Sequence, residues 1–257
     1  MVFILSWTSY AQDGLKQDYY EDGTLKEEAT YVKGKVEGWL RKYHPNGQIE
    51  TEAFCKDGKI HGVYRGWTEE GVMVRDGQCQ FGKPDGLCRA WYPSGELQFE
   101  HNYELGYKNG RCKSYYENGN IEFDEIYKLG KKHGLCKKWN ESGVLIKEGT
   151  FFNDLANGLL KEWDDDGVLV SEGNYAMGNE EGMHYRYMSK APIPIKTYKS
   201  SYLNGKRDGL WQAFYEDGTM AYEGHYVAGQ KDGVWKHWNE DGSLKREEKW
   251  KMGERLP

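Results

Sequence analysis

Carboxylates are the side chains that recur most regularly in this chain. Nine of them follow one another at a spacing that is nearly always 24 residues: Glu28, Glu52, Asp76, Glu100, Asp124, Glu148, Glu172, Glu223 and Glu247. Groups of carboxylates hold metal ions or act in general acid–base catalysis. A catalytic pair, however, occurs once in a protein and not in nearly every repeat. We therefore interpret this column as one half of a charge ladder.

Basic side chains form a second column, thirteen residues after the carboxylates: Arg41, Arg65, Arg89, Lys113, Lys137, Lys161 and Lys236. If the chain folds back in a hairpin between the two columns, they lie on neighbouring strands. A fold-back centred about eight residues after each carboxylate would make the acidic and basic side chains diagonal neighbours. Such pairs maintain the register of a sheet and its solubility.

The histidines do not suggest a metal site. They are His44, His61, His101, His133, His184, His225 and His237. Only His61 and His133 share a repeat position, and at three repeats they would be roughly 29 Å apart. Motifs such as Cys-x-x-Cys, His-Glu-x-x-His, Gly-x-Ser-x-Gly and the P-loop are also missing from the sequence. We therefore predict a protein that is not an enzyme and has no catalytic residues, metal or cofactor.

The five cysteines occupy two repeat positions, Cys55 and Cys79 the first, and Cys88, Cys112 and Cys136 the second. Equivalent positions of neighbouring hairpins are two strands apart, about 9.6 Å, which exceeds the ~7 Å limit for a disulfide. Cys79 and Cys88 are the pair that one hairpin would bring face to face. We predict either a single disulfide between these two or five thiols that serve as small core residues.

A repeat of 24 residues positions all of these columns. The glycines that mark it are Gly23, Gly47, Gly71, Gly95, Gly119, Gly143 and Gly167, and Gly218 and Gly242 continue it. The 51 residues from Gly167 to Gly218 equal two repeats plus three residues, and Pro192-Ile193-Pro194 supplies this insertion after Ala191. Counted from these anchor glycines, the carboxylates lie at +5 and the basic residues at +18. A fixed period of this length is typical of repeat architectures.

Each repeat contains two short segments with strand character, at about +1 to +9 and +15 to +21. Pairs such as Asn46-Gly47 and Asp217-Gly218 are typical of tight hairpin turns. These features predict an all-β fold, an elongated, solenoid-like single antiparallel sheet of stacked 24-residue β-hairpins. Residues 13–257 would form a half unit, nine full hairpins and another half unit, with an irregular unit at 191–209. Such a sheet would be roughly 90 Å long.

Residues 1–12 differ from the repeats. A short apolar run precedes Ser9-Tyr10-Ala11, a pattern of small residues that is typical of secretory cleavage sites, but no basic residue precedes the run. The segment is therefore either a signal-peptide remnant or an apolar N-terminus that caps the sheet. The first alternative predicts an exported, periplasmic or cell-envelope protein, and the second a cytoplasmic one.

The charge of the chain bears on its partners. A formal net charge of −6 argues against nucleic-acid binding. A module that reads lipid headgroups would carry a basic stripe, so a membrane lipid is a weaker candidate than a protein partner. A small-molecule ligand is not expected.

The stretch Tyr222-Glu223-Gly224-His225-Tyr226, followed by Gly229 and Gly233, resembles the MORN repeat, and the resemblance covers nearly the whole chain. Units such as residues 139–149, WNESGVLIKEG, resemble the bacterial variant found in the YwqK-type antitoxin component family. The resemblance implies stacked β-hairpins and a non-enzymatic scaffold. We accordingly expect a protein-binding scaffold, with an antitoxin- or immunity-type component as one form of it. The alternative is a membrane-surface, lipid-headgroup-binding or cell-envelope-associated module.

Aromatic side chains at +20 are the candidates for contact with a partner. In the middle of the array they are Trp67, Trp91, Tyr115, Trp139 and Trp163, whereas flanking units carry Tyr43, Tyr187 and Phe214. Tryptophan adds contact area and an N–H donor, and it is common at binding hot spots. The alternative is that these side chains only cover the sheet. The inserted Pro192, Ile193 and Pro194 are the next candidates.

Overall fold

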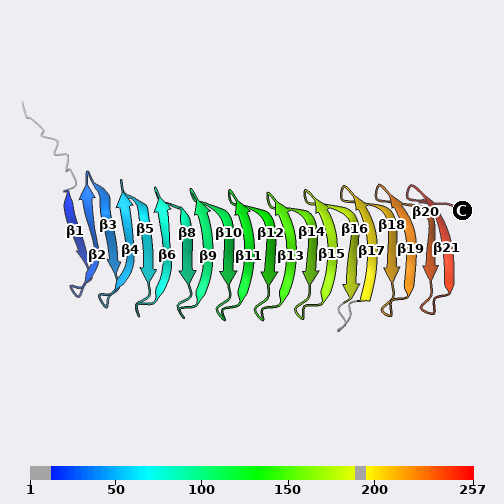
Figure 1. The fold of residues 1–257 in the computed structure, drawn as a ribbon, viewed down its shortest axis with the longest axis horizontal. Coiled ribbons are helices and arrows are strands. Elements are labelled where there is room, and N and C mark those ends of the chain that lie inside the picture. The colour runs from blue at the N-terminus through cyan, green and yellow to red at the C-terminus, as the bar shows by residue number, and fades with distance from the viewer. Residues whose placement is uncertain (1–12, 189–194) are drawn as a thin grey trace, which may run out of the picture. The chain divides into compact units, whose positions relative to one another are not determined.

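The computed structural model describes residues 13–188 and 195–257, and within these ranges the chain forms strands and turns and no helix (Figure 1). The predicted all-β fold of stacked antiparallel hairpins is therefore confirmed. The predictions for residues 1–12 and for Pro192, Ile193 and Pro194 lie outside the described residues. The chain divides into two compact units, one that ends at Gly119 and one that begins at Asn120, which are described separately.

The first unit is an open antiparallel sheet in which consecutive strands pair; β7 and β8 form one interrupted strand, since both pair with β6. Its strands are β1 (Gly14–Tyr19), β2 (Leu25–Val32), β3 (Lys35–Tyr43), β4 (Ile49–Lys56), β5 (Lys59–Trp67), β6 (Met73–Gln80), β7 (Lys83–Pro84), β8 (Gly86–Trp91), β9 (Leu97–Glu104) and β10 (Tyr107–Tyr115).

The second unit repeats the same arrangement, again with consecutive strands paired antiparallel. Its strands are β11 (Ile121–Lys128), β12 (Lys131–Trp139), β13 (Leu145–Phe152), β14 (Leu155–Trp163), β15 (Leu169–Ala176), β16 (Asn179–Met188), β17 (Ile195–Leu203), β18 (Lys206–Phe214), β19 (Met220–Val227), β20 (Gln230–Trp238), β21 (Leu244–Lys251) and β22 (Glu254–Arg255).

Two-residue turns at +10 and +11 close the hairpin of each repeat. Both turn residues have positive φ, for example Lys33 at 51° and Gly34 at 76°, as a type I′ turn requires. Asn153 and Asp154 make the same turn without glycine, at 50° and 70°. The +11 position is glycine in the other repeats, and Asp154 can replace it because Asn and Asp tolerate the left-handed region best among the other residues.

The Asn-Gly and Asp-Gly pairs also lie in hairpin connections, as predicted, but in the connections that join antiparallel strands of successive repeats and not in the two-residue turns. They belong to longer connections between repeats, in which the amide of Gly47 donates to the carbonyl of His44 over 2.8 Å. Gly47 has a φ of 83°, whereas Asn46 does not have positive φ. The Asn46 Oδ1 atom instead accepts a hydrogen bond from the amide of Gln48 over 2.9 Å. These connections resemble a type I turn that ends in a left-handed glycine.

The register within each hairpin also differs from the prediction. Because the turn lies at +10 and +11, the second strand begins at +12 and not at +15. Two extra residues then form a bulge around the +15 glycine, since Tyr31 pairs with Val36 but Ala29 pairs with Leu40. Consequently Glu28 lies directly opposite Arg41, so the acidic and basic columns face each other and are not diagonal neighbours.

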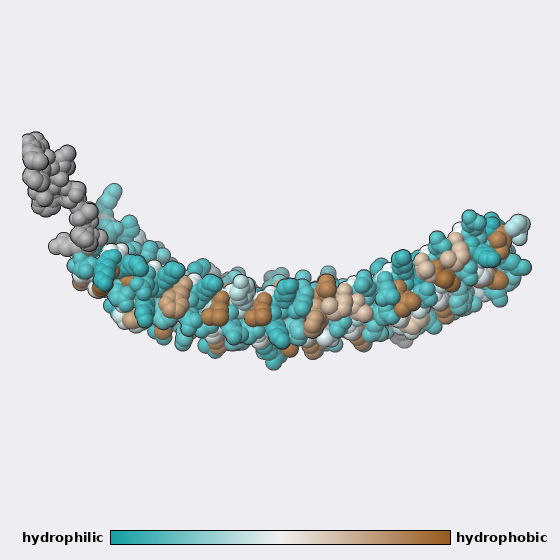
Figure 2. All heavy atoms as spheres, turned by 90° about the horizontal axis from the view of Figure 1, so that it is seen from above, coloured by the Kyte–Doolittle hydropathy of each residue, from teal (hydrophilic) through white to brown (hydrophobic). Residues whose placement is uncertain are grey.

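The two faces of the sheet have different contents in each unit. Side chains alternate between faces along a strand, so +5, +18 and +20 share one face and +6, +8, +13 and +17 the other. We call the first the ladder face and the second the cleft face. The buried apolar residues are few and mostly small: Ala29, Ala53, Cys55, Ala90, Cys112, Cys136, Ala221 and Trp235. Polar side chains cover most of the surface seen in Figure 2, with apolar ones scattered among them.

The five cysteines are free thiols. Cys79 lies opposite Pro84, and Cys88 lies against Gly77, whose added Cβ would be 2.9 Å from the Cys88 sulfur. The hairpin therefore does not place Cys79 and Cys88 face to face, and the predicted opposition of this pair was wrong. The reason is again the shifted turn. Burial raises the pKa of the Cys136 thiol, in keeping with a small core residue.

Side chains at +14 join successive repeats. In several repeats the side chain at +14 accepts a hydrogen bond from the backbone N–H at +10 of the following repeat, which is the first residue of a type I′ turn. Asp85 accepts from Leu105 over 3.0 Å, Asn157 from Met177 over 3.2 Å, and Asp208 from Ala228 over 3.0 Å. The next turn is thus fixed by the repeat before it.

Replacing Asp85 by alanine is expected to lower the free energy of unfolding by about 1 kcal/mol, because the Leu105 amide loses its acceptor. Asp85→Asn is the matched control, since Asn157 occupies the same repeat position and makes the same bond. Urea unfolding of both variants measures the difference. Equal losses in the two variants would contradict the role given to this hydrogen bond.

Candidate binding site

The charge ladder follows the ladder face from strand to strand. In the first unit, Arg41 Nε lies 3.2 Å from Glu52 and Arg41 Nη1 3.5 Å from Glu28, while Arg89 Nε lies 2.7 Å from Glu100. In the second unit, Lys137 lies 2.7 Å from Glu148. These groups are partly exposed, so each pair contributes little, about 0.2–1 kcal/mol. The predicted cross-strand ion pairs are therefore present, and their contribution to the register stays a prediction.

The aromatic side chains at +20 share the ladder face and are half-buried. The first unit holds Trp67, Trp91 and Tyr115, and the second holds Trp139 and Trp163. Their place beside the ladder is illustrated by Tyr43, whose hydroxyl donates to Glu28 over 2.8 Å. Half-burial fits both packing and partner contact, so the binding role of this column stays a prediction.

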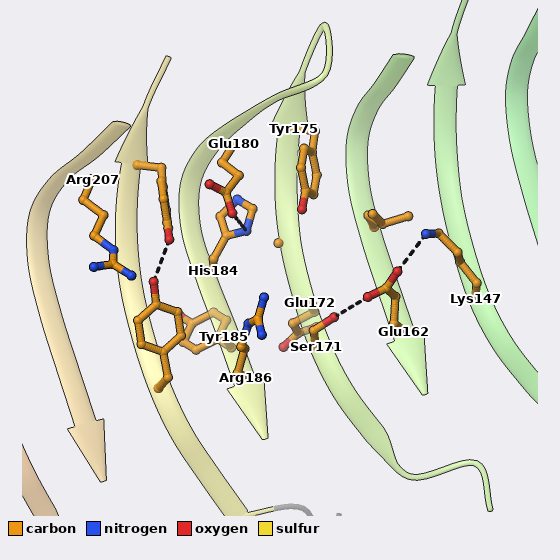
Figure 3. A pocket seen from close by; sticks show the side chains of 14 residues that line it. Lys147, Glu162, Ser171, Glu172, Tyr175, Glu180, His184, Tyr185, Arg186 and Arg207 are labelled. Carbon is orange, nitrogen blue, oxygen red and sulfur yellow. Dashed lines mark hydrogen bonds and ion pairs between the residues drawn. The ribbon is translucent and has the colours of Figure 1, made fainter. Parts of the chain in front are cut away.

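A cleft of about 610 Å³ opens on the cleft face of the second unit (Figure 3). Its lining comes from strands β13 to β18 and consists of Lys147, Leu160, Glu162, Ser171, Glu172, Gly173, Tyr175, Glu180, His184, Tyr185, Arg186, Tyr198, Tyr202 and Arg207. Glu172 and Tyr185 lie at +5 and +18, so they border it from the ladder face.

Gly173 and His184 form the floor of the cleft. They pair across β15 and β16, and a Cβ on Gly173 would lie 2.0 Å from His184 Nδ1. The imidazole therefore occupies the space that a side chain at 173 would fill. Tyr175 and Tyr202 pack edge-on against it, with ring centroids 5.1 Å and 5.0 Å away. His184 Nε2 donates to the carbonyl of Asn174 over 2.7 Å, so this histidine serves packing.

Charged groups line the cleft side by side. Glu162 accepts from Lys147 over 2.7 Å and from Ser171 over 3.1 Å. The Lys147 hydrogen bond holds the pKa of the Glu162 carboxyl below its usual value. Arg186, drawn beside Ser171 in Figure 3, is exposed and forms no hydrogen bond or ion pair with the described residues. An exposed guanidinium that is free to bind is a group that can recognise a carboxylate.

Tyrosines and Arg207 form the other side of the cleft. The hydroxyls of Tyr198 and Tyr202 are 2.6 Å apart, and the Arg207 guanidinium lies 5.6 Å from the Tyr198 ring and 5.4 Å from the Tyr226 ring. Burial raises the pKa of Tyr202, and the hydrogen bond with the Tyr198 hydroxyl raises it further. Ordered phenols and guanidinium groups of this kind suit the recognition of a polar peptide surface.

A smaller pocket of about 370 Å³ lies in the first unit, around Gly77. Gly77 occupies +6, as Gly173 does in the larger cleft. The signal for such a hollow is present in the sequence, because glycine at a position that Ala29 and Ala53 occupy elsewhere leaves space beside the paired strand. At Gly149 and Gly224 the hollow is filled by Leu160 and Trp235.

The histidines that shared a repeat position are packed against aromatic rings. His61 lies 4.6 Å from the Phe81 ring and His133 4.9 Å from the Phe152 ring. Within the described ranges, no three histidine, cysteine, aspartate or glutamate side chains are grouped so that they could hold a metal ion. No helix in that part of the chain has the length and apolarity to cross a membrane.

Comparison with protein families supports the repeat architecture. A family model described as the MORN repeat variant matches residues 12–33, 84–105, 108–129, 132–153, 156–177, 207–228 and 231–252, more than half of the chain. The chain belongs to the MORN repeat variant family. Each matched segment runs from +13 of one repeat to +10 of the next, so the family repeat contains the longer connection and ends inside the type I′ turn.

No curated protein matches the chain. Among solved structures, the crystal structures of TcdB2-TccC3-TEV and TcdB2-TccC3 are similar at 11% and 12% identity, each with a TM-score of 0.19. The matches cover 94% and 91% of this chain but only 14% and 17% of those chains. With TM-scores this low, the similarity carries no argument about fold or function.

Proposed function

We propose that this MORN-repeat protein is a non-enzymatic scaffold whose partner is a protein, and that the partner docks on the cleft of the second unit. The observation that carries the proposal is the 610 Å³ cleft lined by tyrosines and by the exposed Arg186. Tyrosine and arginine are the side chains enriched at binding hot spots. An acidic side chain of the partner is the expected contact of Arg186.

Membrane binding is the competing function. A headgroup-binding surface needs a cluster of unpaired basic side chains. In the cleft, however, Lys147 is paired with Glu162, and on the ladder face Arg41, Arg89 and Lys137 are paired with carboxylates. We therefore expect no flotation with vesicles that contain anionic lipid, and strong flotation would support the competing function.

Arg186→Ala is expected to weaken partner binding about tenfold or more, while the midpoint of unfolding stays within a few degrees, because the side chain is exposed and unpaired. The partner is first captured from the native organism and then titrated against each variant. Trp91→Ala and Trp139→Ala test the alternative surface at +20. If these two variants lose binding while Arg186→Ala binds as the parent does, the partner docks on the ladder face.

An antitoxin- or immunity-type component is the narrower form of this proposal. It requires that the captured partner be toxic to cells when produced alone and harmless when co-produced with this chain. The Arg186→Ala variant should protect less well than the parent. A captured partner that is harmless when produced alone would remove this narrower form and leave the scaffold proposal in place.

A further inference from the structure

The smaller pocket of the first unit lies where a regular row of side chains is interrupted. Residues at +6 and +17 follow one another across the cleft face from strand to strand, and in this unit they alternate between small and large. The row consists of Ala29, Leu40, Ala53, Tyr64, Gly77, Cys88, His101 and Cys112. Within this row, Gly77 and Cys88 are the neighbours that are both small, so one large side chain is missing between Tyr64 and His101.

The second unit shows how such a place can be filled. There Cys136 and Gly149 are also small neighbours. Leu160 pairs with Gly149 from the next strand and leans so close that it would collide with a Cβ added there. At Gly77, by contrast, the three atoms nearest to an added Cβ all belong to Cys88, the sulfur being 2.9 Å away. A pocket of about 370 Å³ lies beside this pair.

The walls of this pocket are mostly apolar. They include the half-buried side chains of Ile60, Tyr64, Pro84, Phe99 and Tyr103. The pocket is larger than the roughly 150 Å³ of an apolar cavity that takes up benzene. Aromatic rings that meet edge-on or offset gain more than their buried area alone provides. A single aromatic ring therefore suits the place of the missing side chain.

Arg75 adds a positive charge to the lining of the pocket. Its side chain is exposed, its Nη1 atom donates to the Tyr64 hydroxyl over 3.3 Å, and it forms no ion pair with another described residue. Its cross-strand neighbours, Gly66 and Ala90, carry no charge. An exposed guanidinium without an acidic partner can recognise a carboxylate.

The other charged residues that line the pocket are already paired. Asp76 accepts a hydrogen bond from Arg65 Nε over 3.1 Å, and Arg89 Nε lies 2.7 Å from Glu100. The charge of Arg75 is therefore the one that is left unbalanced among the lining residues. An occupant with a carboxylate beside its ring complements both the apolar walls and this charge.

We propose that this pocket binds an aromatic side chain of a protein partner, and that the partner carries a carboxylate next to it that pairs with Arg75. The ring takes the place of the large side chain that is missing beside Gly77 and Cys88. The proposal rests on the scaffold function only in that the partner is a protein. It uses no residue of the second-unit cleft, and its test uses synthetic peptides, so its failure and that of the cleft proposal are distinguishable.

Two thiols report whether the pocket is occupied. Cys79 and Cys88 line it and are half-buried, whereas the other three cysteines are buried. Iodoacetamide is therefore expected to label these two in the folded full chain, and mass spectrometry measures the rate at each. A blocked tetrapeptide with a phenylalanine followed by an aspartate should slow the labelling of Cys88 about fivefold or more at ~10 mM, because a one-ring ligand of this size binds with a Kd on the order of 1 mM.

Matched peptides separate the contributions of the ring and the carboxylate. Alanine in place of the phenylalanine should abolish protection, and asparagine in place of the aspartate should weaken binding about threefold. No protection by the phenylalanine peptide, or equal protection by the alanine peptide, would overturn the proposal. Protection by free phenylpropionate without protection by the peptide would overturn the protein partner and assign the pocket to a small aromatic acid.

Cys88→Leu tests the pocket by filling it from within. Its precedent is Leu160 opposite Gly149, so the variant is expected to fold and to lose peptide binding, measured by the broadening of the peptide's ring proton signals. Gln80→Leu is the control, because it adds the same side chain at an exposed position on the ladder face of the same hairpin and should bind as the parent does. Thermal unfolding confirms that each variant is folded. A folded Cys88→Leu variant that still binds the peptide would overturn the proposal.

Arg75→Gln tests the charge independently of the fill. The side chain is exposed, so the variant is expected to fold, and the aspartate and asparagine peptides should bind it equally. A threefold preference for the aspartate peptide that persists in this variant would overturn the assignment of the carboxylate to Arg75.

Discussion

Replacing Trp235 by alanine is expected to lower the free energy of unfolding by about 3–5 kcal/mol, the usual cost of removing a buried tryptophan. The side chain is 2% exposed and is the largest among the fully buried ones. It packs edge-on against Tyr226 at 5.1 Å and lies 5.4 Å from the Trp211 ring. Its indole N–H donates to the carbonyl of His225 over 3.2 Å. Chemical denaturation followed by circular dichroism measures the loss.

Trp139→Ala is the control for this variant. It removes the same side chain at +20, where the tryptophan is half-buried on the ladder face. The expected loss is about half of that at Trp235, because less apolar area leaves the protein interior. Equal losses at the two sites would show that the +20 column is as much a part of the core as +17.

Adding a single carbon opposite the same tryptophan is expected to destabilise the protein as well. Gly224→Ala should cost about 1–3 kcal/mol, the range for overpacking a filled site. A Cβ at this position would lie 2.2 Å from Trp235 Cδ2 and 2.3 Å from Cε2. Backbone strain does not enter, because Gly224 does not have positive φ. The glycine is there to make room for the indole.

A double-mutant cycle separates this close approach from a general intolerance of alanine. Trp235→Leu reproduces the residue of another repeat, where Leu40 pairs with Ala29. In the Trp235→Leu background, Gly224→Ala should therefore cost little, which gives a coupling energy of at least about 1 kcal/mol. Denaturation of the parent, both single variants and the double variant measures it. Additive losses would contradict the contact between Gly224 and Trp235 as the cause.

The elements themselves could be predicted from the residues because they depend on local properties. Anchor glycines such as Gly47 and Gly71 recur where the backbone needs positive φ, and strand residues alternate between them. The charge ladder was also predictable, since one carboxylate and one basic residue recur in most repeats. The direct pairing of Glu28 with Arg41 was not, because a two-residue error in the position of the turn changes every pair in the hairpin.

The sequence by itself determined the period, the strand content and the membership of a repeat family, since these follow from glycine spacing and alternation along the chain. Only the tertiary structure decided which columns meet. The turn at Lys33 and Gly34 uses a residue that is not typical of type I′ turns, so its place was set by the pairing of whole strands. The cleft over Gly173 arises in the same way. A missing side chain leaves a hollow only where the paired strand places His184 across it and Tyr175 and Tyr202 at its sides, and that depends on the register.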